Sequence, residues 1–182
     1  MNGLLTAADS LLLVVDIQER LAPAVEAGDA ATARTVLLLE AARVLQVPVV
    51  VSEQYPAGLG PSVASVRERV AEADRYPKVT FSCVGDAAIR ARLLAAGRRQ
   101  VVAVGMETHV CVLQSAFGLA ALGLAPYIVE DAVASRRASD RAAGLARMRA
   151  AGIGIVSAEM VVFEWLERAG SAQFKELSRL VK

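Results

Sequence analysis

The feature that most constrains the fold is a series of short apolar runs separated by stretches of helical periodicity. Each run is rich in Val, Ile and Leu and is bounded by turn residues, a pattern typical of strands buried on both faces. The runs cover residues 11–15, 48–52, 101–105, 126–130 and 153–157. Strands that alternate with helices form parallel sheets with right-handed crossovers. The sequence therefore predicts an α/β fold.

Helical patterns occupy most of the intervening segments. They cover residues 30–46, 86–96, 109–122 and 138–151, and several of them end at a glycine, as helices often do. A further strand is expected at 78–82, KVTFS, and a loop at 53–61, EQYPAGLGP. Residues 159–181 are expected to form one or two closing helices.

Length and composition narrow the class of ligand. A chain of 182 residues is long enough for one well-buried domain, so we expect a single domain over residues 1–182. Lys and Arg number 20 and Asp and Glu number 19, a balance that favours neither nucleic acid nor a charged membrane surface as a partner. No apolar stretch approaches the ~18 residues of a membrane span. The expected ligand is a small molecule.

The chain start and the cysteines indicate a compartment. The first residues lack the basic region and the cleavage site of a signal peptide, so we expect a cytoplasmic protein. Cys83 and Cys111 are the two cysteines, and a reducing compartment would keep both as free thiols.

Polar residues follow the predicted strands, where parallel α/β sheets bind their ligands. Asp16 follows the first strand, residues 53–55 follow the second, Lys78 opens the short third, and residues 107–111 follow the fourth. If the first and fourth strands are neighbours at the point where the strand order reverses, Asp16 and Cys111 face the same crevice.

Several familiar sites are missing from the sequence. There is no glycine-rich dinucleotide motif after the first strand and no GxxxxGK[ST] phosphate loop. The nearest match to a serine nucleophile elbow, around Ser62, lacks its last glycine. His109 is the only histidine, so a zinc site of the usual kind is not expected. It lies two residues before Cys111, and positions two apart on a helix do not share a face.

A thiol, a carboxylate and an ammonium remain. Cys111 at a helix start would have its thiolate favoured by the positive end of the helix. Asp16 could accept the thiol proton, and Lys78 could hold Asp16 and stabilise developing negative charge. Backbone N–H groups of residues 107–111 could bind an oxyanion. These parts are those of nucleophilic attack on a carbonyl carbon.

Five strings in register carry a family resemblance: LLVVDIQERL, SEQYPAGLG, YPKVTFSC, VGMETHVCVLQSA and VEDAVASR. With them the chain resembles the isochorismatase-like cysteine hydrolases, and is most similar to the small isochorismatase-domain proteins of undefined substrate. The resemblance implies a three-layer α-β-α, Rossmann-like fold with a six-stranded parallel sheet. It also implies a catalytic triad of Asp16, Lys78 and Cys111, a thioester-like intermediate, and homo-oligomers of two or more copies.

The resemblance extends to the oxyanion site and also shows a departure. It implies a non-proline cis peptide between Met106 and Glu107, with the amides of Glu107 and Cys111 as oxyanion donors. Members of the family that deamidate nicotinamide carry an Asp-x-His and a further His as metal ligands after the second strand, where this chain reads SEQYPAGLG. We therefore expect neither metal nor cofactor. The founding activity of the family, cleavage of an enol ether, is similar to a reaction that needs no cysteine, so Cys111 favours an amide, ureide or related acyl substrate.

Other residues have weaker assignments. Gln18, Gln54, Tyr55, Phe81 and His109 are candidates for the substrate pocket, although each also suits ordinary packing or loop chemistry. Cys83 is expected to be unnecessary for activity. Two other functions use the same fold without turnover, a thiol redox sensor and a small-molecule binding protein. A receiver-like phosphoacceptor fits less well because the acidic pair and the late lysine are missing.

Overall fold

The computed structural model describes residues 3–181. Its sheet has six strands in the order β3-β2-β1-β4-β5-β6, and every neighbouring pair is parallel. The strands are β1 (Ser10–Val15), β2 (Val49–Gln54), β3 (Arg75–Lys78), β4 (Gln100–Met106), β5 (Ala125–Ala134) and β6 (Gly154–Val156). The predicted six-stranded parallel sheet is confirmed.

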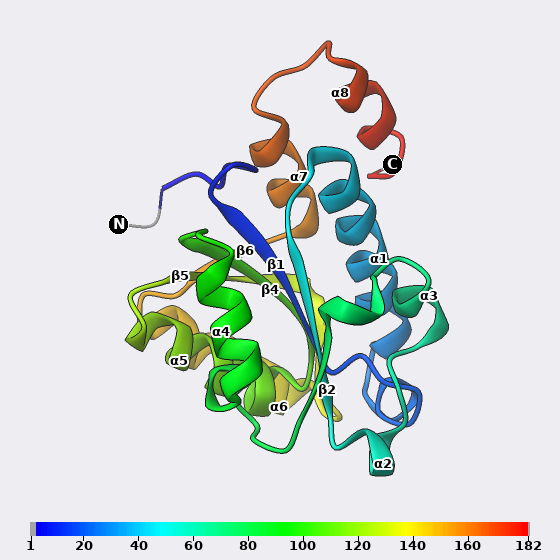
Figure 1. Cartoon of the computed structure of the whole chain (residues 1–182), viewed down its shortest axis with the longest axis vertical. Coiled ribbons are helices and arrows are strands. Elements are labelled where there is room, and N and C mark those ends of the chain that lie inside the picture. Colours follow the sequence, from blue (N-terminus) through cyan, green and yellow to red (C-terminus); the bar gives the residue numbers. More distant parts are fainter. Residues whose placement is uncertain (1–2, 182) are drawn as a thin grey trace.

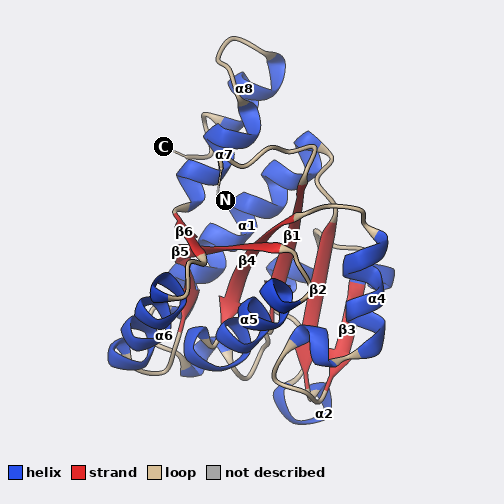
Figure 2. Ribbon diagram, turned by 90° about the vertical axis from the view of Figure 1, so that its left-hand side faces the viewer, coloured by secondary structure: helices blue, strands red, loops and turns tan. Residues whose placement is uncertain are grey.

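Helices cover both faces of the sheet (Figures 1 and 2). The α-helices are α1 (Gly28–Leu45), α2 (Pro56–Leu59), α3 (Ala64–Arg67), α4 (Ala87–Ala95), α5 (Leu113–Ala121), α6 (Ala138–Ala150), α7 (Ala158–Leu166) and α8 (Ala172–Leu177). Short 3-10 turns are η1 (Ala22–Ala24), η2 (Glu72–Asp74) and η3 (Cys83–Gly85), and η4 (Thr108–Val112) is a π-helical turn. Within residues 3–181, no helix has the length and apolar character that crossing a bilayer requires.

Alternation along the strands builds two cores. Leu12 and Val14 of β1 pack in a cluster with α1 and α7, whereas Leu11, Leu13 and Val15 pack in a second cluster with α4, α5 and α6. Successive side chains of a strand point to opposite faces, so a strand that is apolar throughout needs helices on both sides. Figure 1 shows the sheet nearly edge-on between these two helical layers.

Five of the predicted strands form where the apolar runs lie, but the short third strand was placed wrongly. The structure has β3 at Arg75–Lys78 rather than at 78–82, so Lys78 closes this strand instead of opening it. The strand lies at the edge of the sheet beside β2, and Pro77 sits within it. Proline is tolerated in edge strands, where one row of backbone groups needs no sheet partner. Pro77 therefore lies inside the strand and does not mark its start.

The segment 53–61 is also more ordered than a loop. β2 continues to Gln54, and the next residues form the short helix α2. Pro56 stands at the first position of this helix, where its missing N–H costs nothing.

Candidate active site

The strand order brings the two main candidates to one edge of the sheet. β1 and β4 are direct neighbours, with Val15 in register with Gly105, so Asp16 and the turn η4 leave the sheet side by side. The predicted adjacency of the first and fourth strands is confirmed, and the Asp16 and Cys111 side chains are in contact. Gly105 has a φ of 116°, and a side chain there would overlap the Val15 carbonyl oxygen. Glycine is required here because β4 bends close to β1 just before the site.

Asp16 is fully buried, and Lys78 and Ser52 both bind its carboxylate. Lys78 Nζ lies 2.7 Å from Oδ2, and the Ser52 hydroxyl donates to Oδ1 over 2.6 Å. The backbone N–H of Asp16 also donates to Ser52 O, and its φ of 53° lies in the left-handed region. Asp tolerates that conformation better than most residues. The turn thus directs the Asp16 carboxylate toward Ser52 and Lys78.

Lys78 has no exposed side-chain surface, and oxygen atoms surround its ammonium group. Besides Asp16, Nζ donates to Gln54 Oε1 at 2.6 Å and to the carbonyl oxygens of Phe81 and Thr80 at 3.2 and 3.3 Å. A buried ammonium needs such partners to remain charged. Lys78 is therefore held in one position, and through it Asp16.

Cys111 lies in η4, directly before α5, and is 6% exposed. Burial raises the pKa of its thiol far above that of a free cysteine. The negative charge of Asp16 and a hydrogen bond between the two side chains raise this pKa further, whereas the charge of Lys78 lowers it. Burial and the adjacent carboxylate thus favour the neutral thiol, which runs against the expected stabilisation of a thiolate at the helix start.

The peptide bond between Met106 and Glu107 is cis, at the position that the resemblance implied. The side chain of Glu107 is nearly buried, and its Oε1 accepts from the backbone N–H of Arg136 at 3.2 Å and from its Nε at 2.9 Å. Arg136 thus pairs with this carboxylate.

Two of the pocket candidates support the site from behind. Gln18 is fully buried, and its amide donates to the carbonyls of Gln54 and Gly60 and accepts from the Gln54 N–H. Gln54 uses its own side chain on Lys78 and on the Val79 carbonyl. Both side chains are therefore taken up in fixing the segment that carries Lys78.

The other three candidates lie nearer the surface. Tyr55 is 57% exposed and Phe81 is 53% exposed. Tyr55 helps to line a cavity of about 330 Å³ next to Lys78. His109 is partly buried, and its Nδ1 lies 3.1 Å from Ser135 Oγ.

The sequence interpretation missed the residues behind the carboxylate. Ser52 lies in β2, Cys83 begins η3 and Ser115 belongs to α5, and all three are fully buried. Cys83 Sγ lies 3.4 Å from Ser52 Oγ, and the Cys83 N–H donates to Ser115 Oγ over 2.8 Å. The spacing of Cys111 and Ser115, four residues apart on a predicted helix, was the available signal for one of them.

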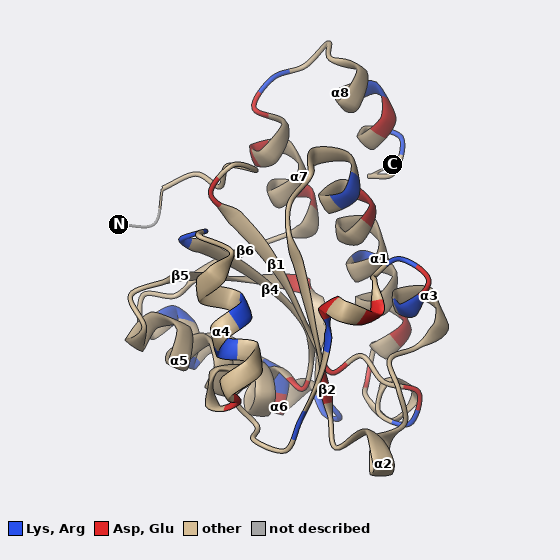
Figure 3. Cartoon of the chain, viewed as in Figure 1, with Lys and Arg blue, Asp and Glu red and all other residues tan. Residues whose placement is uncertain are grey.

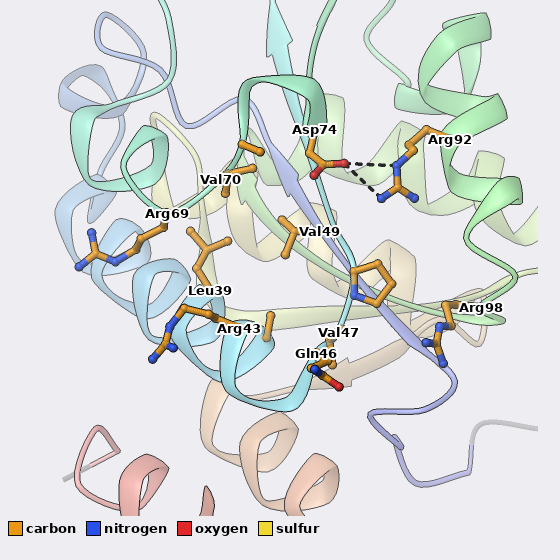
Figure 4. A pocket seen from close by; sticks show the side chains of 13 residues that line it. Leu39, Arg43, Gln46, Val47, Val49, Arg69, Val70, Asp74, Arg92 and Arg98 are labelled. Carbon is orange, nitrogen blue, oxygen red and sulfur yellow. Dashed lines mark hydrogen bonds and ion pairs between the residues drawn. The ribbon is translucent and has the colours of Figure 1, made fainter.

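A separate cavity of about 370 Å³ lies at the opposite, amino end of the sheet (Figure 4). Arginines line it, but three of them are engaged by carboxylates: Arg92 by Asp74, Arg69 by Glu40, and Arg43 by Glu40 and Glu176. The C-terminal turn of α1 also borders it, and that end of a helix repels anions. The residues that line this cavity include no Cys, Ser, Thr, Lys or His.

Comparison with known families agrees with this geometry. The family model described as "Isochorismatase domain" matches residues 10–160, which include Asp16, Lys78 and Cys111. The chain belongs to the isochorismatase family. An isochorismatase domain-containing protein 1 from Danio rerio is 38% identical over 99% of this chain, which spans 63% of that relative's length.

Solved structures show the same isochorismatase fold. The MAR1 ribonuclease of Caenorhabditis elegans superposes with a TM-score of 0.92 and 32% identity, covering 98% of this chain and 92% of that one. The YcaC product of Escherichia coli, described as an octameric hydrolase of unknown specificity, has a TM-score of 0.92 and 21% identity, covering 99% and 91% of the two chains.

Proposed function

We propose that this isochorismatase-family chain is a metal-independent cysteine hydrolase that acts on a small amide, ureide or related acyl compound. The supporting observation is the contact of a nearly buried thiol, Cys111, with the carboxylate of Asp16, which Lys78 holds from the other side. A neutral thiol beside a fixed base is ready to lose its proton only when it attacks. This arrangement confines its reactivity to a bound electrophile.

The steps follow from these positions. Asp16 accepts the thiol proton as Cys111 Sγ bonds to the carbonyl carbon, and the carbonyl oxygen becomes an oxyanion that the amides of Glu107 and Cys111 stabilise. The tetrahedral intermediate collapses to a thioester as the C–N bond breaks, and the proton on Asp16 passes to the leaving nitrogen. Asp16 then removes a proton from water, which attacks the thioester. The C–S bond breaks to release the acid, and Asp16 returns its proton to the Cys111 thiolate, which restores the free thiol.

No step uses a metal ion. In the described range, 3–181, no three His, Cys, Asp or Glu side chains gather as a metal site would require. The carboxylate that contacts the nucleophile, Asp16, is already paired with Lys78. The positive charge that a metal supplies elsewhere comes here from the Lys78 ammonium.

The partners that we propose are a small substrate and further copies of the chain. Octameric assembly in the Escherichia coli relative supports a homo-oligomer. Positive and negative residues are interspersed over the elements (Figure 3), whereas a nucleic-acid surface gathers positive charge. We therefore propose no nucleic-acid substrate, although one relative is called a ribonuclease. The two free, buried thiols fit a reducing compartment such as the cytoplasm.

The test is hydrolysis of a panel of small amides, ureides and p-nitrophenyl acetate by the parent, Cys111→Ala and Asp16→Asn. We expect at least one compound to be turned over by the parent with a transient acyl adduct on Cys111, visible by intact mass. Both variants should lose about 10³-fold or more of that rate.

A Cys111→Ala protein that keeps the parent's rate on every compound would contradict the proposal. Absence of any turnover, together with a stable sulfenic acid on Cys111 after peroxide treatment, would favour the redox sensor instead.

A further inference from the structure

The residues behind the Asp16 carboxylate form one continuous chain of hydrogen bonds. It runs from Ser115 through the backbone and thiol of Cys83 to the Ser52 hydroxyl, and from there to Asp16 Oδ1. Every link is buried, so water cannot replace it. This chain of hydrogen bonds therefore joins α5, the helix that follows Cys111, to Asp16, the proposed base.

The direction of donation in this chain is fixed. A carboxylate only accepts, so the single proton of Ser52 points to Asp16, and Ser52 Oγ must accept from the Cys83 thiol. Burial and the charge of Asp16 raise the pKa of Cys83, which keeps this thiol protonated and able to donate. Lys78 occupies the other carboxylate oxygen. Apart from its contact with Cys111, Asp16 is thus held by Ser52 on one oxygen and by Lys78 on the other.

The packing of η3 against α5 favours this particular chain of hydrogen bonds. Ser115 lies four residues after Cys111, so the two side chains share a face of the helical segment. Gly118 lies one turn further along α5, where a Cβ would overlap the side chain of Val84. The glycine lets η3 lie directly against α5 and brings the Cys83 backbone within reach of Ser115.

We propose that Ser52 and Cys83 are positioning residues that set the orientation of the Asp16 carboxylate toward Cys111. Neither touches the reacting atoms. The inference rests on the proposed function, because it assigns to Ser52 and Cys83 the orientation of its general base. It also gives Cys83 a positioning role, whereas Cys111 is the proposed nucleophile.

The experiment is the rate of iodoacetamide labelling at Cys111 from pH 6 to 10, read by peptide mass. Asp16, Lys78 and Cys83 are the groups whose charges act on this thiol. Asp16→Asn should raise the rate at pH 8.5 by at least about 10-fold, since it removes a charge and an acceptor that favour the neutral thiol. Ser52→Ala should raise it by about 3–10-fold, because a carboxylate free to turn gives a weaker hydrogen bond to Cys111.

A double-mutant cycle shows whether Ser52 affects the labelling of Cys111 through Asp16. In an Asp16→Asn background, adding Ser52→Ala should change the rate by less than about 2-fold. Ser52→Thr, which keeps the hydroxyl, and Cys83→Ser, which keeps a donor, should stay near the parent rate. Cys83→Ala should shift the rate in the same direction as Ser52→Ala.

Ser10→Ala is the matched control for general loosening of the protein. Ser10 is an equally buried hydroxyl at the other end of β1, where it accepts from Trp165 Nε1 and donates to Gln100. It should lower thermal stability without changing Cys111 labelling. An unchanged rate in Ser52→Ala, or a Ser52→Ala effect that persists without Asp16, overturns the inference. Labelling requires no turnover, so this failure is distinct from a failure of the hydrolase proposal.

Discussion

The two ends of the sheet both hold ion pairs, but the pairs differ in what surrounds them. At the carboxyl end, Lys78 and Asp16 have no exposed side-chain surface. At the amino end, the Arg92 and Asp74 side chains in the cavity of Figure 4 are 29% and 33% exposed. Water solvates the second pair whether or not it forms, whereas each member of the first depends on its partner. The comparison separates a buried pair at the proposed active site from an ordinary surface pair.

The largest effect is expected from breaking the buried pair. Lys78→Met leaves the Asp16 charge buried without its cation, so we expect a loss of about 3–5 kcal/mol in the free energy of unfolding. Urea denaturation monitored by circular dichroism measures it. A loss below about 1 kcal/mol would mean that Asp16 reaches water in the native protein.

A second contrast concerns two glycines with positive φ at opposite ends of β4. Gly105→Ala should cost about 3 kcal/mol or more, because the new Cβ would overlap the Val15 carbonyl and the backbone is strained for alanine. Gly97→Ala is the matched control, with a φ of 64° and no atom within 4 Å of the new Cβ. It should cost only about 1–2 kcal/mol. If Gly105→Ala and Gly97→Ala lost equal stability in thermal denaturation, the close approach of Gly105 to Val15 would not require glycine.

The pH dependence of stability should also differ between the two ends. Folding raises the pKa of Cys111 and Cys83, so the stability they contribute is complete below about pH 8.5 and is lost as pH rises. Each thiol should add a slope of about 1.4 kcal/mol per pH unit above that point. Glu40, by contrast, has its pKa lowered by its hydrogen bond with Arg43, so its contribution is lost in acid.

The measurement for the thiols is the free energy of unfolding from pH 7 to 10.5, for the parent and Cys111→Ala. The parent should lose stability more steeply than the variant above pH 8.5. Parallel curves would indicate that Cys111 reaches solvent and ionises normally in the folded protein.

The smallest effect is expected at the amino end. Arg92→Gln removes an exposed pair with Asp74, so we expect a change of about 0.2–1 kcal/mol in the free energy of unfolding. A double-mutant cycle with Asp74→Asn isolates the pair. A coupling above about 2 kcal/mol would place this pair on a par with the buried one and erase the contrast.

The sequence by itself determined the succession of strands and helices along the chain and the parallel type of the sheet, because apolar periodicity is a local property. It also placed Asp16 and Cys111 at strand ends, where parallel sheets gather their ligands. It placed the third strand wrongly, since an edge strand of four residues containing Pro77 has little apolar signal of its own.

Only the tertiary structure decided the state of the site. The pKa of Cys111 depends on burial and on the charge of Asp16, which is 95 positions away in the chain, and both favour the neutral thiol. Likewise Ser52, Cys83 and Ser115 lie in three separate family strings that do not show their contact. Their chain of hydrogen bonds exists only because β2, η3 and α5 meet. Electrostatics and hydrogen bonding between distant segments follow from packing in space, which no local pattern encodes.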